Sequence, residues 1–439
     1  MNKLFYFLSA LPAFFLFLFS EKAVAQYLVS EQLKTIPGLE VQVKDTSGSG
    51  FQNCFILQFE QDINHASATS KKFKQRVFLF HKNENLPTVF VTEGYEAAYA
   101  SRKGFREELS KIYKANLVVV EHRYFGTSVP DSIDYTYLNL EQATADYHAI
   151  RQKLGDLYKG KWIATGISKG GQTSLSYRAF YPNDVDVTVA YVAPVNKSLT
   201  DPRIEKFLNN DGTVECRKKI YEFQLGLLKQ EDTLVALYKQ YAEKNKYTFC
   251  YDPRLMFEYE VLEYPFSFWQ WGHGVCDSIP LANAKPERLL QELVDNVPLK
   301  YYTEKGIRAS EAFFYQAYTE LGFYEYNPEP FKNYLPQKEY PNSLFAPHNA
   351  QLTFNPKTKE KVINYLNTSG NNIIYIYGEL DPWSATAFTP NDKTNALKIV
   401  KPKGSHATRI LNMAPGQQQK IYSTLESWIG IKPVNGSLK

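Results

Sequence analysis

The feature that most constrains the fold is an alternation of short apolar runs with stretches of helical spacing, in two separate parts of the chain. The apolar runs are 87–94, 116–123, 161–168, 185–195, 371–378 and 396–404. Strands joined through helices lie parallel, with right-handed crossovers. The order therefore predicts an α/β fold with a mostly parallel sheet.

Two regions depart from this alternation. Two strand-like runs come first, "CFILQFEQDI" from Cys54 and "RVFLFHK" from Arg76, and we expect them to pair antiparallel. From 201 to about 342, apolar residues recur at three- and four-residue spacing, which favours helices. An aromatic stretch at 264–274 is expected to interrupt them. A helical block inserted between two parts of one sheet indicates a cap. The expected division is a core of 26–196 and 343–439 and a helical cap (lid) of 197–342.

The N-terminus resembles a secretory signal peptide rather than part of the fold. Lys3 precedes the apolar run 4–19, and small residues occupy positions 23 and 25. This pattern predicts a signal peptide of 1–25 that is cleaved before Gln26. The run is short for a membrane span, and no later run is long and apolar enough to be one. We therefore expect an exported protein, secreted or periplasmic, without a membrane span in its mature form.

Charge and cysteine usage exclude other classes. Fifty basic residues stand against 46 acidic ones, with no basic stripe, which argues against nucleic-acid binding. The four cysteines fit no zinc spacing, and export permits disulfides. We predict one bridge among Cys216, Cys250 and Cys276, with Cys54 in an early strand. No metal or organic cofactor is expected.

The stretch "TGISKGGQT" carries the first chemical signal. Its residues Gly166 to Gly170 fit G-x-S-x-G around Ser168, a pattern that chance produces in roughly one chain in ten of this size. Here it follows a predicted strand and opens a predicted helix, as a nucleophile elbow does. The N–H of Lys169 would then point to a developing oxyanion. The alternative for Ser168 is an ordinary helix N-cap.

An elbow serine needs an acid and then a histidine further along the chain. Asp381 follows one late strand in "YGELDPWSA", and His406 follows the next in "KGSHAT". His406 would take the serine proton, and Asp381 would hold the imidazole. Taken alone, Asp381 could begin a turn and His406 could be a surface residue. Glu379 competes with Asp381 for the acid role.

Loops after the first two parallel strands should complete the site. In "TEGYEAAY", we expect the backbone N–H of Tyr95 to be the second oxyanion donor, with Gly94 allowing close approach. The alternative is an ordinary strand-to-helix turn. Glu121, His122 and Arg123 end the next strand at the same edge, where we expect them to support the site through hydrogen bonds.

Several motifs together resemble a known family. "EHRYFGTSVP", "GISKGGQTS", "YRAFYPNDVDVTVAYVAP" and "YGELDPWSA" are similar to the bacterial secreted prolyl tripeptidyl aminopeptidase family and, more distantly, to prolyl carboxypeptidase and its dipeptidyl peptidase relatives. The lysine after the nucleophile matches the first group, whereas the carboxypeptidases usually have tyrosine there. The resemblance covers about 93–194 and 377–406. It implies an α/β-hydrolase core with a helical cap and a triad of Ser168, Asp381 and His406.

The resemblance also implies the removal of short N-terminal peptides, often after proline. We therefore expect a secreted serine exopeptidase that releases tri- or dipeptides through an acyl-enzyme. The residues alone indicate only a hydrolase with a nucleophilic serine. A secreted esterase or lipase on the same fold stays open, as does a non-catalytic surface binding protein.

An enzyme that measures from the N-terminus must bind a free ammonium group, and a carboxylate is its natural partner. The sequence does not rank the candidates, each of which could instead be a surface charge. They are Glu93 and Glu96 beside the expected oxyanion loop, and Glu258, Glu260 and Glu263 in the cap. Trp383 and Trp269 are further substrate-binding candidates.

Overall fold

The computed structural model describes residues 29–271 and 276–434. The expected signal peptide therefore lies outside the described residues. Across the part that is described, no helix is both long and apolar enough to cross a membrane.

One nine-stranded sheet organises the chain. Its spatial order is β1-β2-β3-β5-β4-β6-β7-β8-β9. The strands are β1 (Leu39–Lys44), β2 (Asn53–Asp62), β3 (Lys72–His81), β4 (Thr88–Thr92), β5 (Asn116–Val120), β6 (Trp162–Ile167), β7 (Val187–Tyr191), β8 (Ile373–Gly378) and β9 (Ala396–Lys401). β1, β2, β3 and β5 pair antiparallel, and the pairs from β5 to β9 are parallel. The predicted α/β-hydrolase class is confirmed.

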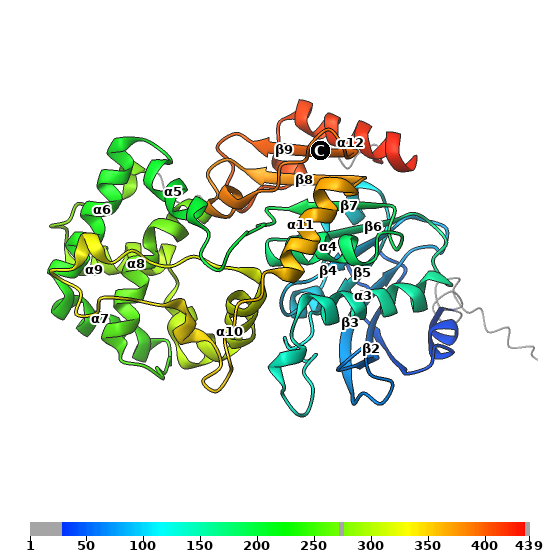
Figure 1. The fold of residues 1–439 in the computed structure, drawn as a ribbon, viewed down its shortest axis with the longest axis horizontal. Helices are drawn as coiled ribbons and strands as arrows, with labels where there is room; N and C mark the ends of the chain where they lie inside the picture. The colour runs from blue at the N-terminus through cyan, green and yellow to red at the C-terminus, as the bar shows by residue number, and fades with distance from the viewer. Residues whose placement is uncertain (1–28, 272–275, 435–439) are drawn as a thin grey trace, which may run out of the picture.

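Helices cover both faces of this sheet. On one face lie α3 (Leu140–Gly155), α4 (Lys169–Phe180) and α11 (Lys357–Thr368), which cross in front of the strands in Figure 1. On the other lie α2 (Glu108–Ile112) and α12 (Pro415–Ile429). Along β4, Phe90 packs on the first side while Val89 and Val91 pack on the second. Successive residues of a strand face opposite sides of the sheet, and helices cover both sides here. Nearly every residue of these strands is therefore buried, which explains their continuous apolar sequence.

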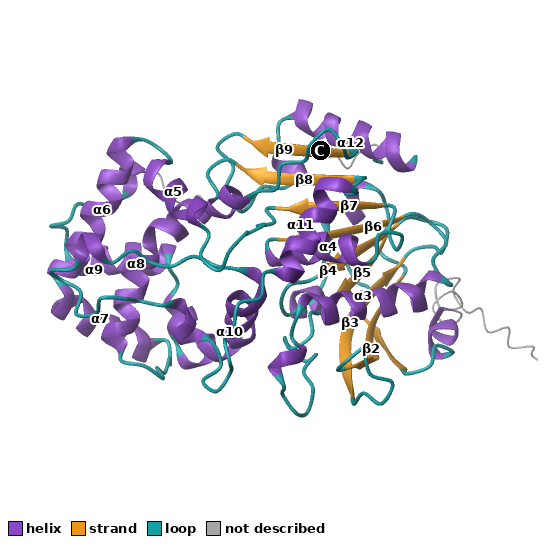
Figure 2. Cartoon of the chain, in the orientation of Figure 1, coloured by secondary structure: helices purple, strands orange, loops and turns teal. Residues whose placement is uncertain are grey.

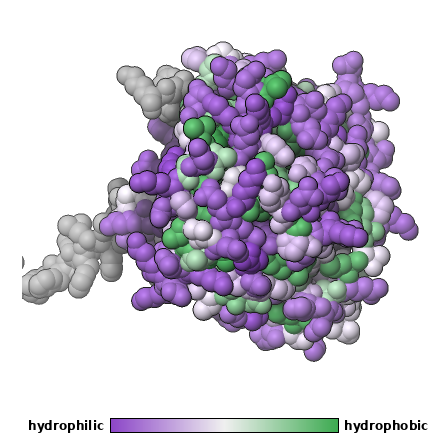
Figure 3. All heavy atoms as spheres, turned by 90° about the vertical axis from the view of Figure 1, so that its left-hand side faces the viewer, coloured by the Kyte–Doolittle hydropathy of each residue, from purple (hydrophilic) through white to green (hydrophobic). Residues whose placement is uncertain are grey.

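A helical body is inserted between β7 and β8. It contains α5 (Pro202–Asn210), α6 (Val214–Lys229), α7 (Glu231–Lys244), α8 (Pro253–Trp271), α9 (Pro286–Asn296) and α10 (Glu304–Gln316). We call these helices the cap. They pack around an apolar core of their own. In Figure 2 the arrowheads of β7, β8 and β9 point toward the cap, so the carboxyl ends of the strands face it. The outer face of the cap is mostly hydrophilic (Figure 3).

We expected the stretch 264–274 to interrupt the cap helices. This prediction is wrong for 264–271, which belong to α8. α8 runs unbroken to Trp271 and contains Pro265. Proline has no N–H, so it cannot donate to the carbonyl of Val261 four residues earlier. The side-chain amide of Gln224, on α6, donates to that carbonyl at 2.8 Å instead. A neighbouring helix thus satisfies the group that proline leaves without its partner, and the helix continues.

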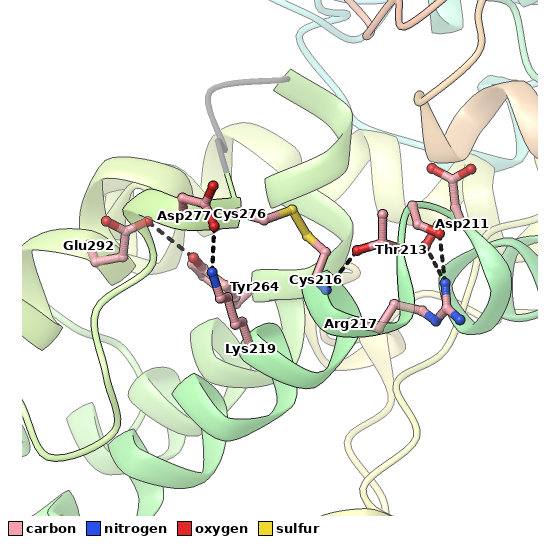
Figure 4. Close-up of a disulfide and its surroundings, with 10 residues drawn as sticks. Asp211, Thr213, Cys216, Arg217, Lys219, Tyr264, Cys276, Asp277 and Glu292 are labelled. Atoms are coloured by element: carbon pink, nitrogen blue, oxygen red, sulfur yellow. Dashed lines mark hydrogen bonds and ion pairs between the residues drawn. A yellow bond between two sulfur atoms is a disulfide. The ribbon is translucent and has the colours of Figure 1, made fainter.

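One disulfide joins two segments of the cap. Cys216, near the start of α6, is bonded to Cys276, with the two Cα atoms 5.3 Å apart (Figure 4). This confirms the expected bridge in the later region. Cys54 is a buried thiol, and Cys250 is an exposed one. The two bonded cysteines are 60 residues apart in sequence. Closing a loop of that length removes enough denatured-state entropy to stabilise the fold by about 4 kcal/mol.

The Gln224 contact leads to a stability prediction. Gln224→Leu keeps a similar volume but leaves the buried Val261 carbonyl without a donor, which should lower the free energy of unfolding by about 1–3 kcal/mol. In a Pro265→Ala background the new N–H can donate to the same carbonyl, so the same change should cost about 1 kcal/mol less. Urea unfolding of the four proteins in this double-mutant cycle measures both costs. An equal cost in the two backgrounds would contradict the assignment.

Candidate active site

Ser168 lies on the turn between β6 and α4 in a conformation that few residues adopt. Its φ is 57° and its ψ is −122°, so the backbone is strained. Its N–H donates to the carbonyl of Tyr191 on β7 at 2.9 Å, which fixes the turn. A Cβ at Gly166 would stand 2.2 Å from the carbonyl oxygen of Gly170, so this position requires glycine. The Ser168 side chain makes no capping hydrogen bond to α4.

Asp381 and His406 form a buried hydrogen-bonded pair. Each follows one of the last two strands, β8 and β9, so both lie at the carboxyl edge that also carries Ser168. His406 Nδ1 lies 2.8 Å from Asp381 Oδ2, and the two residues are 4% and 0% exposed. A proton on Nδ1 leaves Nε2 as the basic nitrogen of the ring. Glu379, the competing acid, is exposed and accepts the N–H of Lys403 at 2.7 Å.

The cap meets the catalytic edge at the end of α8. The carbonyl of Gln270 accepts the backbone N–H of His406 at 2.7 Å, and the Trp271 ring stands edge-on to the imidazole at 5.6 Å. Gln270 also lines the cavity that contains Ser168. Among the described residues, no hydrogen bond joins the Ser168 hydroxyl to His406. Such contacts often shorten only when substrate binds.

The loop after β4 approaches the nucleophile turn more closely than any side chain would allow. A Cβ on Gly94 would stand 2.6 Å from Cγ of Lys169. The Lys169 ammonium donates to the carbonyl of Gly94 and lies over the rings of Tyr95 and Phe125, at 5.2 and 4.6 Å from their centroids. Burial lowers the pKa of Lys169 well below its usual range.

This lysine fixes one peptide group. The carbonyl of Gly94 and the N–H of Tyr95 belong to the same planar trans unit, so they point in opposite directions. Because Lys169 holds the carbonyl, the N–H of Tyr95 is fixed on the other side of that unit. Within the described residues, neither this N–H nor the N–H of Lys169 donates to a backbone or side-chain oxygen. Tyr95, Ser168 and Lys169 line one cavity.

Of the three residues that follow β5, Glu121 and His122 contact this loop. The N–H of His122 donates to the carbonyl of Tyr95 at 3.1 Å. Glu121 accepts the N–H of Ala97 at 2.9 Å. Arg123 is buried in a bidentate pair with Asp146, with both contacts at 2.7 Å. His122 is buried against the carbonyl of Arg123, and burial lowers its pKa well below the usual range. All three residues are buried, but the partners of Arg123 lie outside the loop after β4 and include the carbonyl of Tyr137.

The cavity at Ser168 has a volume of about 200 Å³. A second cavity of about 250 Å³ shares four lining residues with it: Gln270, Phe313, Phe323 and Tyr324. These four come from the cap and from the chain that returns from it. The sequence did not predict them, because no local pattern shows which cap residues meet the sheet edge when cap and core pack together. We call these two adjoining cavities, which share four lining residues, the linked cavities. They lie between the sheet edge and the cap.

The two tryptophans predicted to bind substrate lie in different cavities. Trp383 lines the Ser168 cavity and packs on Phe323 and Tyr324, with ring centroids 5.5 Å apart in each case. Trp269 instead belongs to the apolar core of the cap and lines a different cavity. Adjacent residues on α8 point in different directions, so Gln270 rather than Trp269 lines the Ser168 cavity.

The five candidate carboxylates differ in whether they line these cavities. Glu93 accepts the N–H of Gly94 at 3.3 Å and the hydroxyl of Tyr99, and burial raises its pKa to about 7. Glu96 is exposed and accepts the N–H of Ala98. Neither lines the two linked cavities.

The three cap carboxylates are all buried on α8. Glu258 and Glu260 accept the hydroxyls of Tyr340 and Tyr238 and do not line the linked cavities. Glu263 lines the second cavity. In the described part of the chain, no three His, Cys, Asp or Glu side chains gather as a metal site would need.

Comparison with known proteins agrees with this geometry. The model of the PS-10 peptidase S37 family matches residues 21–437. A prolyl tri/tetrapeptidyl aminopeptidase of Streptomyces mobaraensis is 32% identical over 415 residues, which cover 92% of this chain and 86% of the relative. Prolyl carboxy peptidase like protein 5 of Caenorhabditis elegans is 27% identical, with 80% and 83% covered. Bovine lysosomal Pro-X carboxypeptidase is 25% identical, with 80% and 82% covered. The chain belongs to the S37 peptidase family and is a serine-type peptidase.

Proposed function

We propose that this chain is a secreted exopeptidase that removes short N-terminal peptides, with Ser168, His406 and Asp381 as its triad. The observation that carries the proposal is the His406–Asp381 pair at the same sheet edge as the strained Ser168. The aminopeptidase from Streptomyces supports the N-terminal direction and a proline preference. Secretion rests on the predicted signal peptide, and N-terminal sequencing of exported protein tests it.

In this mechanism the Ser168 hydroxyl attacks the scissile carbonyl while His406 Nε2 takes its proton. Asp381 stabilises the imidazolium that forms. The Ser168–His406 contact shortens when the substrate fills the cavity. The imidazolium then protonates the amine of the departing segment, and the N-terminal peptide stays bonded to Ser168 as an acyl ester. Water, activated by His406, hydrolyses that acyl-enzyme and frees the serine.

The tetrahedral intermediate carries a negative oxygen that needs fixed donors. The N–H of Lys169 begins α4, where the helix dipole favours negative charge. The N–H of Tyr95 is the second donor. The Lys169 side chain pulls on the carbonyl of that same peptide group and so both orients and polarises its N–H. Lys169 thus contributes a backbone donor directly and positions the other through its side chain.

The cavity wall suits a proline side chain. The rings of Trp383, Phe323 and Tyr324 pack on one another beside Ser168, and Pro194 adds a further apolar surface. A pyrrolidine ring is compact and apolar and can stack on such rings. A cavity of about 200 Å³ is below the usual size of a drug-sized site, so a small substrate group fits it.

A peptide library tests the function. We expect mass spectrometry to show that the purified protein releases tri- or dipeptides from free N-termini, mainly after proline. Ser168→Ala should stay folded and lose turnover by up to ~10^6, because the triad acts as a unit. Turnover of esters alone would favour an esterase. A folded protein that a fluorophosphonate does not label at Ser168 would favour a non-catalytic binding protein.

A second prediction separates the two possible acids. Asp381→Asn should lower kcat by about 10^4, because the imidazole loses its orienting charge. Glu379→Gln should change kcat little, because its carboxylate contacts the Lys403 backbone at the surface. Steady-state kinetics on one proline-containing peptide measures both variants. The reverse order of effects would assign the acid role to Glu379.

A third prediction concerns the lysine that holds the oxyanion loop. Lys169→Met keeps the backbone donor and most of the apolar stem but cannot bond the Gly94 carbonyl. We expect kcat to fall by ~10-fold or more with little change in KM, because only the transition state uses the donor. The melting temperature should hold or rise, because burying an ammonium group costs free energy. An unchanged kcat, or a loss that follows unfolding, would contradict the positioning role.

A further inference from the structure

We infer that Glu263, with the hydroxyls of Tyr324 and Tyr326, binds the α-ammonium group of the substrate. This inference rests on the proposed exopeptidase function and names the group that would measure the peptide from its N-terminus.

Glu263 is a buried carboxylate whose described partners are neutral. It is 7% exposed. It accepts hydroxyls from Ser267 at 2.8 Å, Tyr324 at 2.7 Å and Tyr326 at 2.9 Å. No ion pair to it occurs among the described residues. Burial raises its pKa to about 7, against the lowering effect of the three hydroxyls. A cation that enters here would compensate a charge that the protein leaves uncompensated.

The cavity beside Glu263 adjoins the cavity that contains Ser168. Glu263 and Ser267 line the second cavity, whose wall is otherwise mostly aromatic. Tyr324 lines this cavity and also the Ser168 cavity, so one of the three hydroxyl donors stands between the two. Of the five carboxylates that the sequence left unranked, Glu263 is the one that faces the linked cavities. The tyrosine and phenylalanine faces around it also suit an ammonium group.

The geometry of α8 sets the distance between Glu263 and Gln270. Glu263 and Gln270 are seven residues apart on α8, which is two turns, so they lie on the same face. At 1.5 Å per residue the separation along the axis is about 10 Å. Gln270 stands beside His406 and lines the Ser168 cavity. An extended peptide advances about 3.3–3.6 Å per residue, so about 10 Å corresponds to three residues.

The charges of the lining oppose the reverse orientation. A carboxypeptidase must bind the substrate carboxylate with a cation. Lys169 is the one cationic side chain in the lining of the two cavities as described, and its ammonium is bonded to the Gly94 carbonyl. The described lining thus offers a carboxylate that can bind a substrate ammonium group. It offers no free cationic side chain that could bind a substrate carboxylate.

The test compares one proline-containing peptide with a free N-terminus and its N-acetylated form. For the wild-type protein, acetylation should lower kcat/KM by at least ~10-fold, since it removes the charge-assisted contact. Glu263→Gln should lower kcat/KM for the free peptide only, so that the ratio between the two substrates approaches one. The matched control is Glu260→Gln, a buried carboxylate one turn away on α8 that does not line the cavities. It should keep the wild-type ratio.

The outcomes separate this inference from the proposed function. A wild-type protein that cleaves both peptides equally is not an aminopeptidase, and both would fall. If the wild-type protein prefers the free peptide and Glu263→Gln keeps that preference, the exopeptidase function stands and the Glu263 assignment is wrong. Fluorophosphonate labelling of Ser168 in each variant confirms that the site is assembled.

A second variant covers the case in which Glu263→Gln does not fold. Tyr326→Phe removes one hydroxyl that stabilises the charged carboxylate, while Tyr324 and Ser267 still donate to it. Among the described residues, Tyr302 is a further titratable group that interacts electrostatically with Glu263. The pKa of Glu263 should then rise. Because the free peptide needs the ionised carboxylate, the acid limb of its kcat/KM profile should move to higher pH. The profile of the acetylated peptide should not move. An equal shift in both profiles would contradict the assignment.

Discussion

The active site depends on how closely three backbone segments approach one another. The turn at Ser168 stays strained because the loop after β4 and the end of β7 press against it. Cβ atoms at Gly94 or Gly166 would stand 2.6 and 2.2 Å from neighbouring atoms, so neither position accepts a side chain. This contact places Tyr95, Ser168 and Lys169 around one cavity. The sheet supplies the precision, because its strands fix where each loop begins.

Buried ionisable groups hold the returning cap segment against this core. Glu320, in the turn that ends α10, accepts the N–H of Leu140 at the start of α3 at 2.7 Å. A carboxylate is stabilised at a helix N-terminus. Burial still raises its pKa to about 7, while burial lowers that of nearby Lys359 to about 8. The next residues, 321–324, form a wall of the Ser168 cavity. The joint that attaches the cap therefore also shapes the substrate site.

The features that could be predicted from the sequence are those that local patterns determine. The strands β4 to β9 and the order of Ser168, Asp381 and His406 follow from apolar runs and from the residues just after them. β1 was missed because it is an edge strand with mainly solvent-accessible side chains. The continuity of α8 was missed because Gln224, 37 residues before Val261, replaces the hydrogen bond that Pro265 cannot make. The cavity wall was missed because it depends on how cap and core pack, which no local pattern encodes.

α8 connects the two ends of the proposed substrate site. Near its end, the Gln270 carbonyl holds the backbone of His406, and two turns earlier Glu263 faces the linked cavity. A helix is stiff over two turns, so a peptide bound at Glu263 has its length measured against a rigid element. Any movement of the cap would shift Glu263 and Gln270 together. In the proposed mechanism, binding of the substrate terminus and alignment of His406 are therefore properties of one helix, and a cap displaced from the sheet edge would lose both.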